Sequence, residues 1–322
     1  MAKPHIVIIS PALAKANNGN WQTAHRWASF LRARYTVTLA AQWDGTPCDA
    51  MIALHARRSA SSIADFATAF PAAPLIVVLT GTDLYRDIRS DAAAQCSLQL
   101  ASQLIVLQAE GLHELSPHLR SKALVIYQSA PALKPAKKPV QHFNVMMVGH
   151  LRDEKDPATF MRAAAQVKSG HIRLIHIGDA LDPALGALAQ ATHASFSRYR
   201  WLGNLPHAAT RQRLKRSHLM AITSKMEGGA NVIIEAVTSG VPVLASDIPG
   251  NRGMLGADYA GYFPLGDSAK LAGLCDRAAT DPVFYARLQT QCDIRKTRFT
   301  PQRENAALLK LADNCIHHYA AP

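Results

Sequence analysis

Residues 218–250 of this 322-residue chain read HLMAITSKMEGGANVIIEAVTSGVPVLASDIPG. Short apolar runs rich in β-branched residues predict a strand at each end, over 218–223 and 241–246, and apolar residues at helical spacing predict a helix over 231–239. Gly240 follows this helix, at the position where a left-handed C-terminal cap is favoured. The stretch therefore predicts a βαβ unit, whose two strands run parallel in one sheet.

The loop between the first strand and the helix carries two glycines and a carboxylate. Gly228 and Gly229 allow the backbone to approach a ligand closely, and the free N–H groups of a helix start favour anions. Glu227 lies on this loop, and Glu235 lies eight residues later on the helix. Because a carboxylate can accept two hydroxyls of a sugar at once, this pattern suits a sugar nucleotide. The alternative is two solvated surface charges, although the apolar neighbours of Glu235 argue against an idle carboxylate there.

The pattern E-G-G-x4-I-E-A followed by S-G-V-P-V resembles the E-x7-E signature of retaining glycosyltransferases of family four. This resemblance implies an α/β protein of the GT-B fold, with two Rossmann-like domains facing across a cleft. It implies that Glu235 binds the ribose of a nucleotide diphosphate sugar. It also implies that Glu227 and the neighbouring loop hold the transferred sugar and its diphosphate, through Gly228, Gly229, Ala230 and Asn231.

The composition restricts the partners. No uncharged apolar run approaches the ~20 residues of a membrane span, and the start MAKPHIVIIS lacks the core of a signal peptide, so we expect a cytoplasmic protein without a membrane partner. Five scattered cysteines without a C-x2-C pair suggest neither a disulfide framework nor a zinc site, and most are expected to be buried thiols.

The formal net charge of +12 is spread along the chain in ones and twos. The densest basic runs, RQRLKR at 211–216 and KPAKK at 134–138, are interpreted as a solvated helix face and a linker. This distribution argues against nucleic acid, which favours a contiguous basic patch with aromatic residues. Small anionic substrates suit it better, because a basic cleft concentrates phosphates.

Apolar runs in the N-terminal half predict a parallel sheet with helices between its strands. These runs cover residues 5–10, 36–43, 49–54, 74–80, 104–108 and 123–127. The loop after the first run has Gly19 alone and not G-x-G-x-x-G, which argues against a dinucleotide cofactor and hydride transfer. In GT-B enzymes this loop reaches toward the donor phosphates, so Gly19 and Asn20 are assigned to the donor and Asn18 to the acceptor. A plain surface turn is the alternative.

Basic and polar residues follow two strands of this sheet, at the edge where open α/β sheets bind ligands. His55, Arg57 and Arg58 follow residues 49–54, and Ser59 is expected to cap the next helix. Thr82, Asp83 and Arg86 follow residues 74–80. We predict that the threonine and the arginines bind an acceptor, with surface charges as the alternative.

Residues 129–139, SAPALKPAKKP, predict a linker between two domains. We expect an N-terminal acceptor domain over 1–130 and a C-terminal domain that binds the UDP-sugar over 140–300. The final segment, 301–322, predicts a helix, which in GT-B folds packs back on the first domain. Its expected buried stripe is Ala307, Leu308, Leu311 and Ile316.

The second domain opens with FNVMMVGHLRDEKDP at 143–157. Family-four enzymes carry an arginine after the glycine of this strand and a lysine five residues later, and both bind the diphosphate. Lys155 matches the lysine, whereas His150 occupies the arginine position and Arg152 follows two places on. The resemblance therefore assigns Lys155 to the leaving group, with His150 and Arg152 as candidates beside it.

Four segments resemble a narrower group, the selenosugar synthases of selenoneine biosynthesis: NNGNWQTAHRW, MIALHARRSA, LTGTDLYRD and VGHLRDEKDP. This resemblance implies that selenophosphate is joined to the anomeric carbon of UDP-N-acetylglucosamine or UDP-glucose, giving a 1-selenosugar, UDP and phosphate. A downstream enzyme of the pathway would take over the product. The basic N-terminal loops suit a small phosphate-bearing acceptor, whereas a lipid or glycan would require apolar or aromatic grooves.

The sequence contains no D-x-D motif, so we expect a metal-independent reaction without a cofactor, in which Lys155 and helix amides neutralise the departing UDP. Selenium is already nucleophilic and needs no general base, while His55 or Asp83 would assist hydrolysis of the Se–P bond. Two alternatives are a GT-B glycosyltransferase with an ordinary hydroxyl acceptor and a non-catalytic protein that binds sugar nucleotides.

Overall fold

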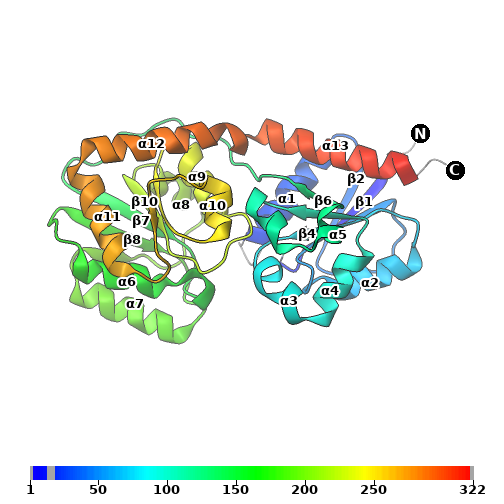
Figure 1. Cartoon of the computed structure of the whole chain (residues 1–322), viewed down its shortest axis with the longest axis horizontal. Helices are drawn as coiled ribbons and strands as arrows, with labels where there is room; N and C mark the ends of the chain where they lie inside the picture. The colour runs from blue at the N-terminus through cyan, green and yellow to red at the C-terminus, as the bar shows by residue number, and fades with distance from the viewer. Residues whose placement is uncertain (1–2, 13–18, 320–322) are drawn as a thin grey trace. The chain divides into compact units, whose positions relative to one another are not determined.

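The computed structural model describes residues 3–12 and 19–319, and the chain divides into two compact units. Unit 1 comprises Met1–Ser129, Glu227–Gly229 and Thr300–Pro322, and unit 2 comprises Ala130–Met226 and Ala230–Phe299. Within the described residues, each unit contains one six-stranded parallel sheet with helices packed on it (Figure 1).

The sheet of unit 1 has the strand order β2-β1-β3-β4-β5-β6. Its strands are β1 (His5–Ile9), β2 (Thr36–Ala40), β3 (Ala50–Leu54), β4 (Leu75–Leu79), β5 (Gln103–Val106) and β6 (Ala123–Val125). Its helices are α1 (Gly19–Leu31), α2 (Ala60–Ala69), α3 (Ile88–Ser90), α4 (Ala92–Leu100), α5 (Pro117–Arg120) and α13 (Pro301–Tyr319), with short helical turns η2 (Asp83–Asp87) and η3 (Ala109–Glu114).

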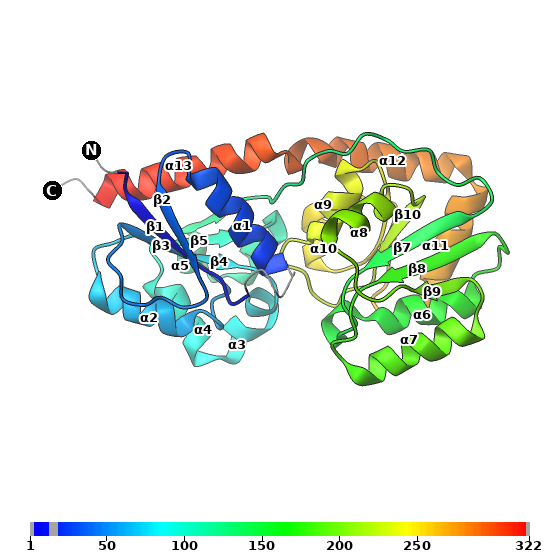
Figure 2. The same cartoon turned by 180° about the vertical axis from the view of Figure 1, so that it is seen from behind.

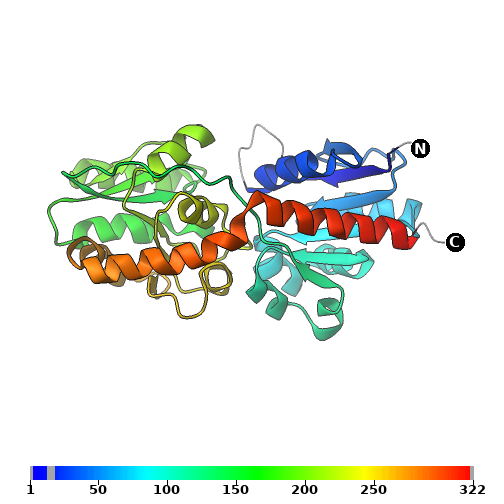
Figure 3. The ribbon, with the colours of Figure 1, turned by 90° about the horizontal axis from the view of Figure 1, so that it is seen from above.

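Helices cover both faces of this sheet. On one face α1 and α13 lie side by side (Figures 2 and 3), and Trp27 of α1 and Leu311 of α13 join the same apolar core as the strand residue Ile52. On the other face Phe66 of α2 and Leu98 of α4 pack together with other strand side chains. Burying a large apolar side chain contributes about 1.5–3 kcal/mol, so these two cores hold the three layers together.

The buried stripe of α13 differs from the predicted one. Leu308 and Leu311 are buried as predicted and Ile316 is half-buried, but Ala307 is exposed and Glu304 is buried. The Glu304 carboxylate accepts hydrogen bonds from Arg26 Nε at 2.7 Å and from Trp27 Nε1 at 2.7 Å. Because these hydrogen bonds compensate the buried negative charge, Glu304 can occupy a position on the inner face of α13 where an apolar residue would be expected.

The sheet of unit 2 has the strand order β12-β11-β10-β7-β8-β9. Its strands are β7 (Phe143–Val148), β8 (Ile172–Ile177), β9 (Tyr199–Trp201), β10 (Leu219–Ile222), β11 (Val243–Ser246) and β12 (Tyr262–Phe263). Its helices are α6 (Pro157–Gln166), α7 (Pro183–Ser195), α8 (His207–Leu214), α9 (Asn231–Thr238), α10 (Pro249–Leu255), α11 (Ser268–Thr280) and α12 (Pro282–Lys296), with the turns η4 (Asp153–Lys155) and η5 (Thr297–Phe299). Helix α6 packs against α7 and α11, and α9 packs against α12.

The predicted βαβ unit is β10, α9 and β11, and β10 pairs with β11 in parallel. Gly240 follows α9 with a φ of +69°, the left-handed conformation expected of a helix-ending glycine. Ser59 does occupy the position before α2, but its hydroxyl donates to the carbonyl of Leu54 at 2.7 Å and does not cap the helix. None of the described helices is both long and apolar enough to cross a membrane.

Candidate functional site

In unit 2, the loops after the neighbouring strands β7 and β10 are joined by several bonds. The hydroxyl of Thr223 donates to the carbonyl of Lys155 at 2.8 Å, and the N–H of Lys225 donates to the carbonyl of Glu154 at 2.9 Å. The Lys225 ammonium also pairs with Asp153 at 2.5 Å. The loop that carries Lys155 is therefore fixed beside the loop that leads into α9.

Three basic residues come from the loop after β7, namely His150, Arg152 and Lys155. His150 accepts a hydrogen bond at Nδ1 from the N–H of Asp179 at 3.0 Å, and burial lowers its pKa, with a further lowering by the positive charges of Arg152 and Lys155. Arg152 Nε is buried and has no hydrogen-bond partner among the described residues. Lys155 is half-buried, and its side-chain carbons lie beside Gly149. The positive charges of this loop are therefore those of Lys155 and of Arg152, whose Nε lies 4.0 Å from Glu154 Oε2, and an anion such as a diphosphate would pair with them.

A buried histidine of β8 fixes the start of this loop. His176 Nε2 donates to the carbonyl of Gly149 at 3.1 Å, and its Nδ1 accepts from the hydroxyl of Tyr199 at 3.0 Å. Burial lowers the pKa of His176 to about 4, so the ring is neutral at neutral pH. A Cβ at Gly178 would lie 1.9 Å from the same Gly149 carbonyl, so glycine is required there.

Glu235 is buried on α9 and is not the solvated surface charge of the alternative interpretation. Its Oε1 accepts a hydrogen bond from His207 Nε2 at 2.6 Å. Arg211, one turn further along α8, was predicted on a solvated helix face, but it is only 8% exposed. Its Nη2 donates to the carbonyl of Pro131 at 2.9 Å. Burial lowers the pKa of Arg211, and the negative charge of Glu235 opposes that shift.

The other end of the E-x7-E pattern, Glu227–Gly229, belongs to unit 1 by its contacts. Glu227 is buried there. A Cβ on Gly228 would lie 2.4 Å from the backbone of Thr80, and one on Gly229 would lie 2.6 Å from Leu107 Cβ. Both glycines are therefore required by close packing against this part of unit 1. Ala230, buried, and Asn231, half-buried, continue into the start of α9 in unit 2.

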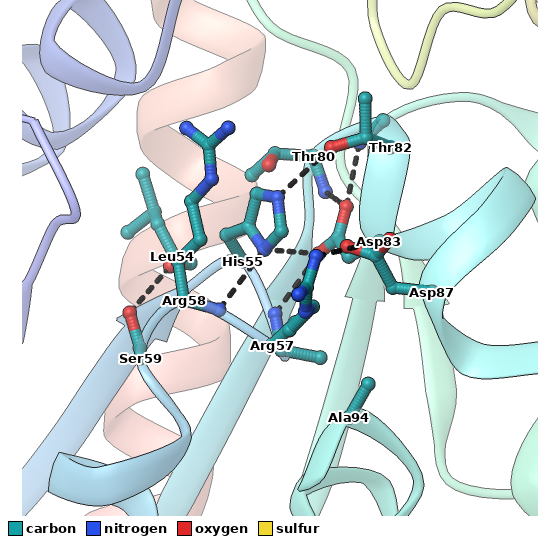
Figure 4. Close-up of polar contacts among 12 residues, drawn as sticks. Leu54, His55, Arg57, Arg58, Ser59, Thr80, Thr82, Asp83, Asp87 and Ala94 are labelled. Carbon is teal, nitrogen blue, oxygen red and sulfur yellow. Dashed lines mark hydrogen bonds and ion pairs between the residues drawn. The ribbon is translucent and has the colours of Figure 1, made fainter. Parts of the chain in front are cut away.

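In unit 1, the loops after the neighbouring strands β3 and β4 meet at His55 and Asp83 (Figure 4). His55 is buried and has a left-handed φ of +73°, which is uncommon for a residue with a side chain. Its Nδ1 accepts from the N–H of Arg58 at 3.3 Å, and its Nε2 lies 3.0 Å from the Thr82 hydroxyl. Burial lowers the pKa of His55, and the charge of Asp83 opposes this. The ring is therefore held by hydrogen bonds in a fixed orientation.

The carboxylate of Asp83 is fully buried and holds the backbone of both loops. Its Oδ1 accepts from the N–H groups of Thr80 at 2.9 Å and Gly81 at 2.8 Å, and its Oδ2 accepts from the N–H of Ala56 at 3.0 Å. Oδ2 also lies 3.9 Å from His55 Nδ1. These bonds give Asp83 a positioning role within the loops.

The three arginines predicted to bind the acceptor differ in their ion-pair partners. Arg57 Nε pairs with Asp91 at 2.9 Å, and Arg86 Nε pairs with Asp87 at 3.0 Å. The guanidinium of Arg58 is exposed and has no hydrogen bond or ion pair among the described residues, and Figure 4 shows it directed away from Asp87. Arg58 is therefore the guanidinium best placed to accept an added anion.

The remaining predicted residues lie at the start of α1 or outside the described residues. Gly19 is exposed and accepts at its carbonyl from the Thr23 hydroxyl at 2.8 Å, and Asn20 is half-buried. Asn18 lies outside the described residues. Within the part of the chain that the structure describes, no three His, Cys, Asp or Glu side chains gather as a metal-ligand set.

Comparison with known proteins bears on this architecture. The family described as "Glycosyl transferases group 1" matches residues 132–293, half of the chain. "Glycosyltransferase 1 domain-containing protein 1" of Xenopus tropicalis is 24% identical over 241 residues, 67% of this chain and 68% of that protein.

Two solved structures match almost the whole chain. HepE of Anabaena in complex with UDP-glucose has a TM-score of 0.78 at 17% identity and covers 97% of this chain and 100% of its own. Sucrose-phosphate synthase from Thermosynechococcus elongatus has a TM-score of 0.80 at 16% identity and covers 98% of this chain and 100% of its own. These likenesses confirm the predicted α/β class with two Rossmann-like sheets of the GT-B type. Together with the family match, they show that the chain belongs to the group 1 glycosyltransferases.

Proposed function

We propose that the chain joins selenophosphate to the anomeric carbon of a UDP-sugar and releases UDP and phosphate. The observation that carries the proposal is the arrangement after β3 and β4, where Arg58, with an exposed guanidinium, follows His55 by three residues, and His55 lies against Asp83. A small dianion suits this polar, basic surface better than a lipid or an oligosaccharide does. These residues also lie in the segments MIALHARRSA and LTGTDLYRD, which resemble selenosugar synthases.

The donor side of the proposal rests on unit 2. The HepE structures contain UDP with glucose and UDP-glucose, which supports a UDP-sugar for this chain. Glu235 would accept the ribose hydroxyls, and Lys155 with Arg152 would offset the charge of the diphosphate, while the neutral ring of His150 would donate a hydrogen bond to it. The donor sugar would be N-acetylglucosamine or glucose.

The proposed reaction has two steps. The selenium lone pair forms a bond to the anomeric carbon while the bond from that carbon to UDP breaks, so UDP leaves with the electron pair. Water then cleaves the Se–P bond and gives inorganic phosphate and the 1-selenosugar as its selenol. The protein contributes by orienting two anions and stabilising the departing charge, with Glu227 at the transferred sugar.

Residues of unit 1 would take part in the second step. His55 would act on the water through the Thr82 hydroxyl, which lies 3.0 Å from its Nε2, because its Nδ1 accepts from the N–H of Arg58 and both oxygens of Asp83 accept backbone N–H groups. Asp83 would then act by positioning His55. The selenol is easily oxidised, so we expect transfer of the product to a downstream enzyme of the same pathway.

The test is an anaerobic incubation of the protein with selenophosphate and either UDP-N-acetylglucosamine or UDP-glucose. We expect UDP, phosphate and a hexose with the isotope pattern of selenium by mass spectrometry. Transfer only to hydroxyl acceptors would instead support an ordinary GT-B glycosyltransferase. Binding of UDP-sugar without turnover of any acceptor would support a sugar-nucleotide-binding protein.

A further inference from the structure

Two residues of α8 face Glu235 from one side. His207 and Arg211 are four residues apart on a helix, so they share one face. His207 donates to Glu235 Oε1 at 2.6 Å, and Arg211 is buried one turn further along the same helix. All three residues lie in unit 2.

The Glu235 carboxylate is fixed on one side only. Among the residues that the structure describes, His207 is its single hydrogen-bond partner, although a carboxylate offers about four acceptor positions. The His207 side chain is 42% exposed, whereas that of Glu235 is 11% exposed. The carboxylate is therefore held by a residue at the surface and keeps acceptor capacity for a ligand.

The buried guanidinium of Arg211 is fixed by a hydrogen bond to the backbone. Its Nη2 donates to the carbonyl of Pro131, and its Nε is buried without a hydrogen-bond partner among the described residues. The guanidinium cannot be deprotonated under ordinary conditions, so it supplies a permanent positive charge near Glu235. Such a positive charge offsets part of the cost of removing a carboxylate from water.

We infer that His207 is a positioning residue that holds Glu235 ready for a vicinal diol and so sets the preference for ribose over deoxyribose. The inference rests on the proposed function, in which Glu235 accepts the ribose hydroxyls. Without His207, the three side-chain torsions of Glu235 would be free in the empty site and would have to be ordered on binding.

Two substitutions at one position separate the hydrogen bond from the bulk of the side chain. In His207→Gln, the amide Nε2 is as many bonds from Cα as the ring Nε2 and still donates to Glu235. In His207→Leu, an apolar side chain removes the donor, and His207→Ala is a second variant without it. Gln212→Leu is the matched control, because Gln212 is exposed on the same helix and has no hydrogen bond among the described side chains.

Calorimetric titration with UDP and with 2′-deoxy-UDP tests the inference. We expect His207→Leu and His207→Ala to weaken UDP binding about five- to tenfold, as for one lost charge-assisted hydrogen bond. 2′-Deoxy-UDP lacks one hydroxyl of the diol. For this nucleotide, the same substitutions should weaken binding by a factor at most about half as large as for UDP. His207→Gln and Gln212→Leu should bind both nucleotides within about twofold of the parent.

Two results would overturn the inference. Equal losses for both nucleotides would show that His207 only maintains the structure of α8, and unchanged UDP affinity in both donor-free variants would remove His207 from the site. Failure of the proposed function is distinguishable. If the donor assignment is wrong, the parent protein itself binds neither UDP nor a UDP-sugar, and if only the acceptor assignment is wrong, the titrations of parent and variants with UDP keep the expected differences. Thermal unfolding of each variant confirms that the compared proteins are folded.

Discussion

Arg58, Arg57 and Arg86 differ in what already binds their guanidinium groups. Arg57 and Arg86 pair with Asp91 and Asp87, whereas Arg58 has no side-chain partner among the described residues. A phosphate at this surface could therefore pair with Arg58 directly. To bind it, Arg57 and Arg86 would have to share their guanidinium groups with a carboxylate or break their ion pairs.

We predict that Arg58→Ala raises the KM for selenophosphate or lowers turnover about tenfold or more, the scale of a lost charge-assisted hydrogen bond. Arg57→Ala and Arg86→Ala should have smaller effects. The Kd for UDP should stay near that of the parent in all three variants, because these arginines lie in unit 1 and Glu235 and Lys155 lie in unit 2. Steady-state kinetics with calorimetry measures both quantities.

The outcome that contradicts this prediction is normal selenophosphate turnover in all three variants. The acceptor would then bind elsewhere, and Lys15 with residues 17–20 would be the next place to examine by substitution. Arg58→Lys is the matched control, since lysine keeps the charge but cannot bind a phosphate in the bidentate manner of arginine.

Single residues were also where prediction from the sequence failed most. Arg211 and Glu304 are both buried, although a charged residue on a helix is normally assigned to solvent. Arg211 bonds to a carbonyl 80 positions away and Glu304 to an arginine 278 positions away. His207 was missed for the same reason, because its partner is 28 positions along the chain. Local periodicity carries no information about such partners.

Strands and helices were predicted well because their signals are local. The residues of β10, α9 and β11 lie inside the predicted ranges, and Gly240 ends α9 as its position indicated. The loops between them were not predictable in detail. The bond from Thr223 to the carbonyl of Lys155, for example, exists only because β7 and β10 are neighbours in the sheet.

His176 joins the strand β8 to the loop after β7. Its protonation should therefore affect how the free energy of unfolding depends on pH. The ordinary pKa of histidine is about 6.5, whereas burial lowers that of His176 to about 4. Between these pH values the unfolded chain binds a proton that the native ring does not. We therefore predict that this group makes stability fall as the pH drops from about 6.5 to about 4, by on the order of 3 kcal/mol in total.

Denaturant unfolding of the parent and of His176→Gln at pH 7, 6 and 5 tests this prediction. The variant keeps an amide donor for the Gly149 carbonyl but cannot titrate, so its stability should fall less steeply with decreasing pH. His218, whose pKa burial also lowers to about 4, is present in both proteins and cancels in the comparison. Parallel curves for the two proteins would mean that His176 does not titrate in this range.

For the whole molecule, the excess of basic residues has a consequence for catalysis. The chain carries 35 lysines and arginines against 23 aspartates and glutamates, and basic groups gather at the carboxyl ends of strands in each unit. Under the proposed function both substrates are anions, so a positive field would raise their local concentration. The same groups would neutralise the charge that develops on UDP as it leaves.

We therefore predict that transfer continues at an undiminished rate in excess EDTA. The physical reason is that Lys155, Arg152 and the amides at the start of α9 would supply the positive charge that a divalent ion supplies to the diphosphate in enzymes with a D-x-D motif, which this sequence lacks. UDP release is measured with and without chelator, and Lys155→Met, tested in the same assay, should lower turnover under both conditions. Activity that disappears with EDTA and returns with magnesium or manganese would contradict the prediction and assign the leaving-group charge to a metal ion.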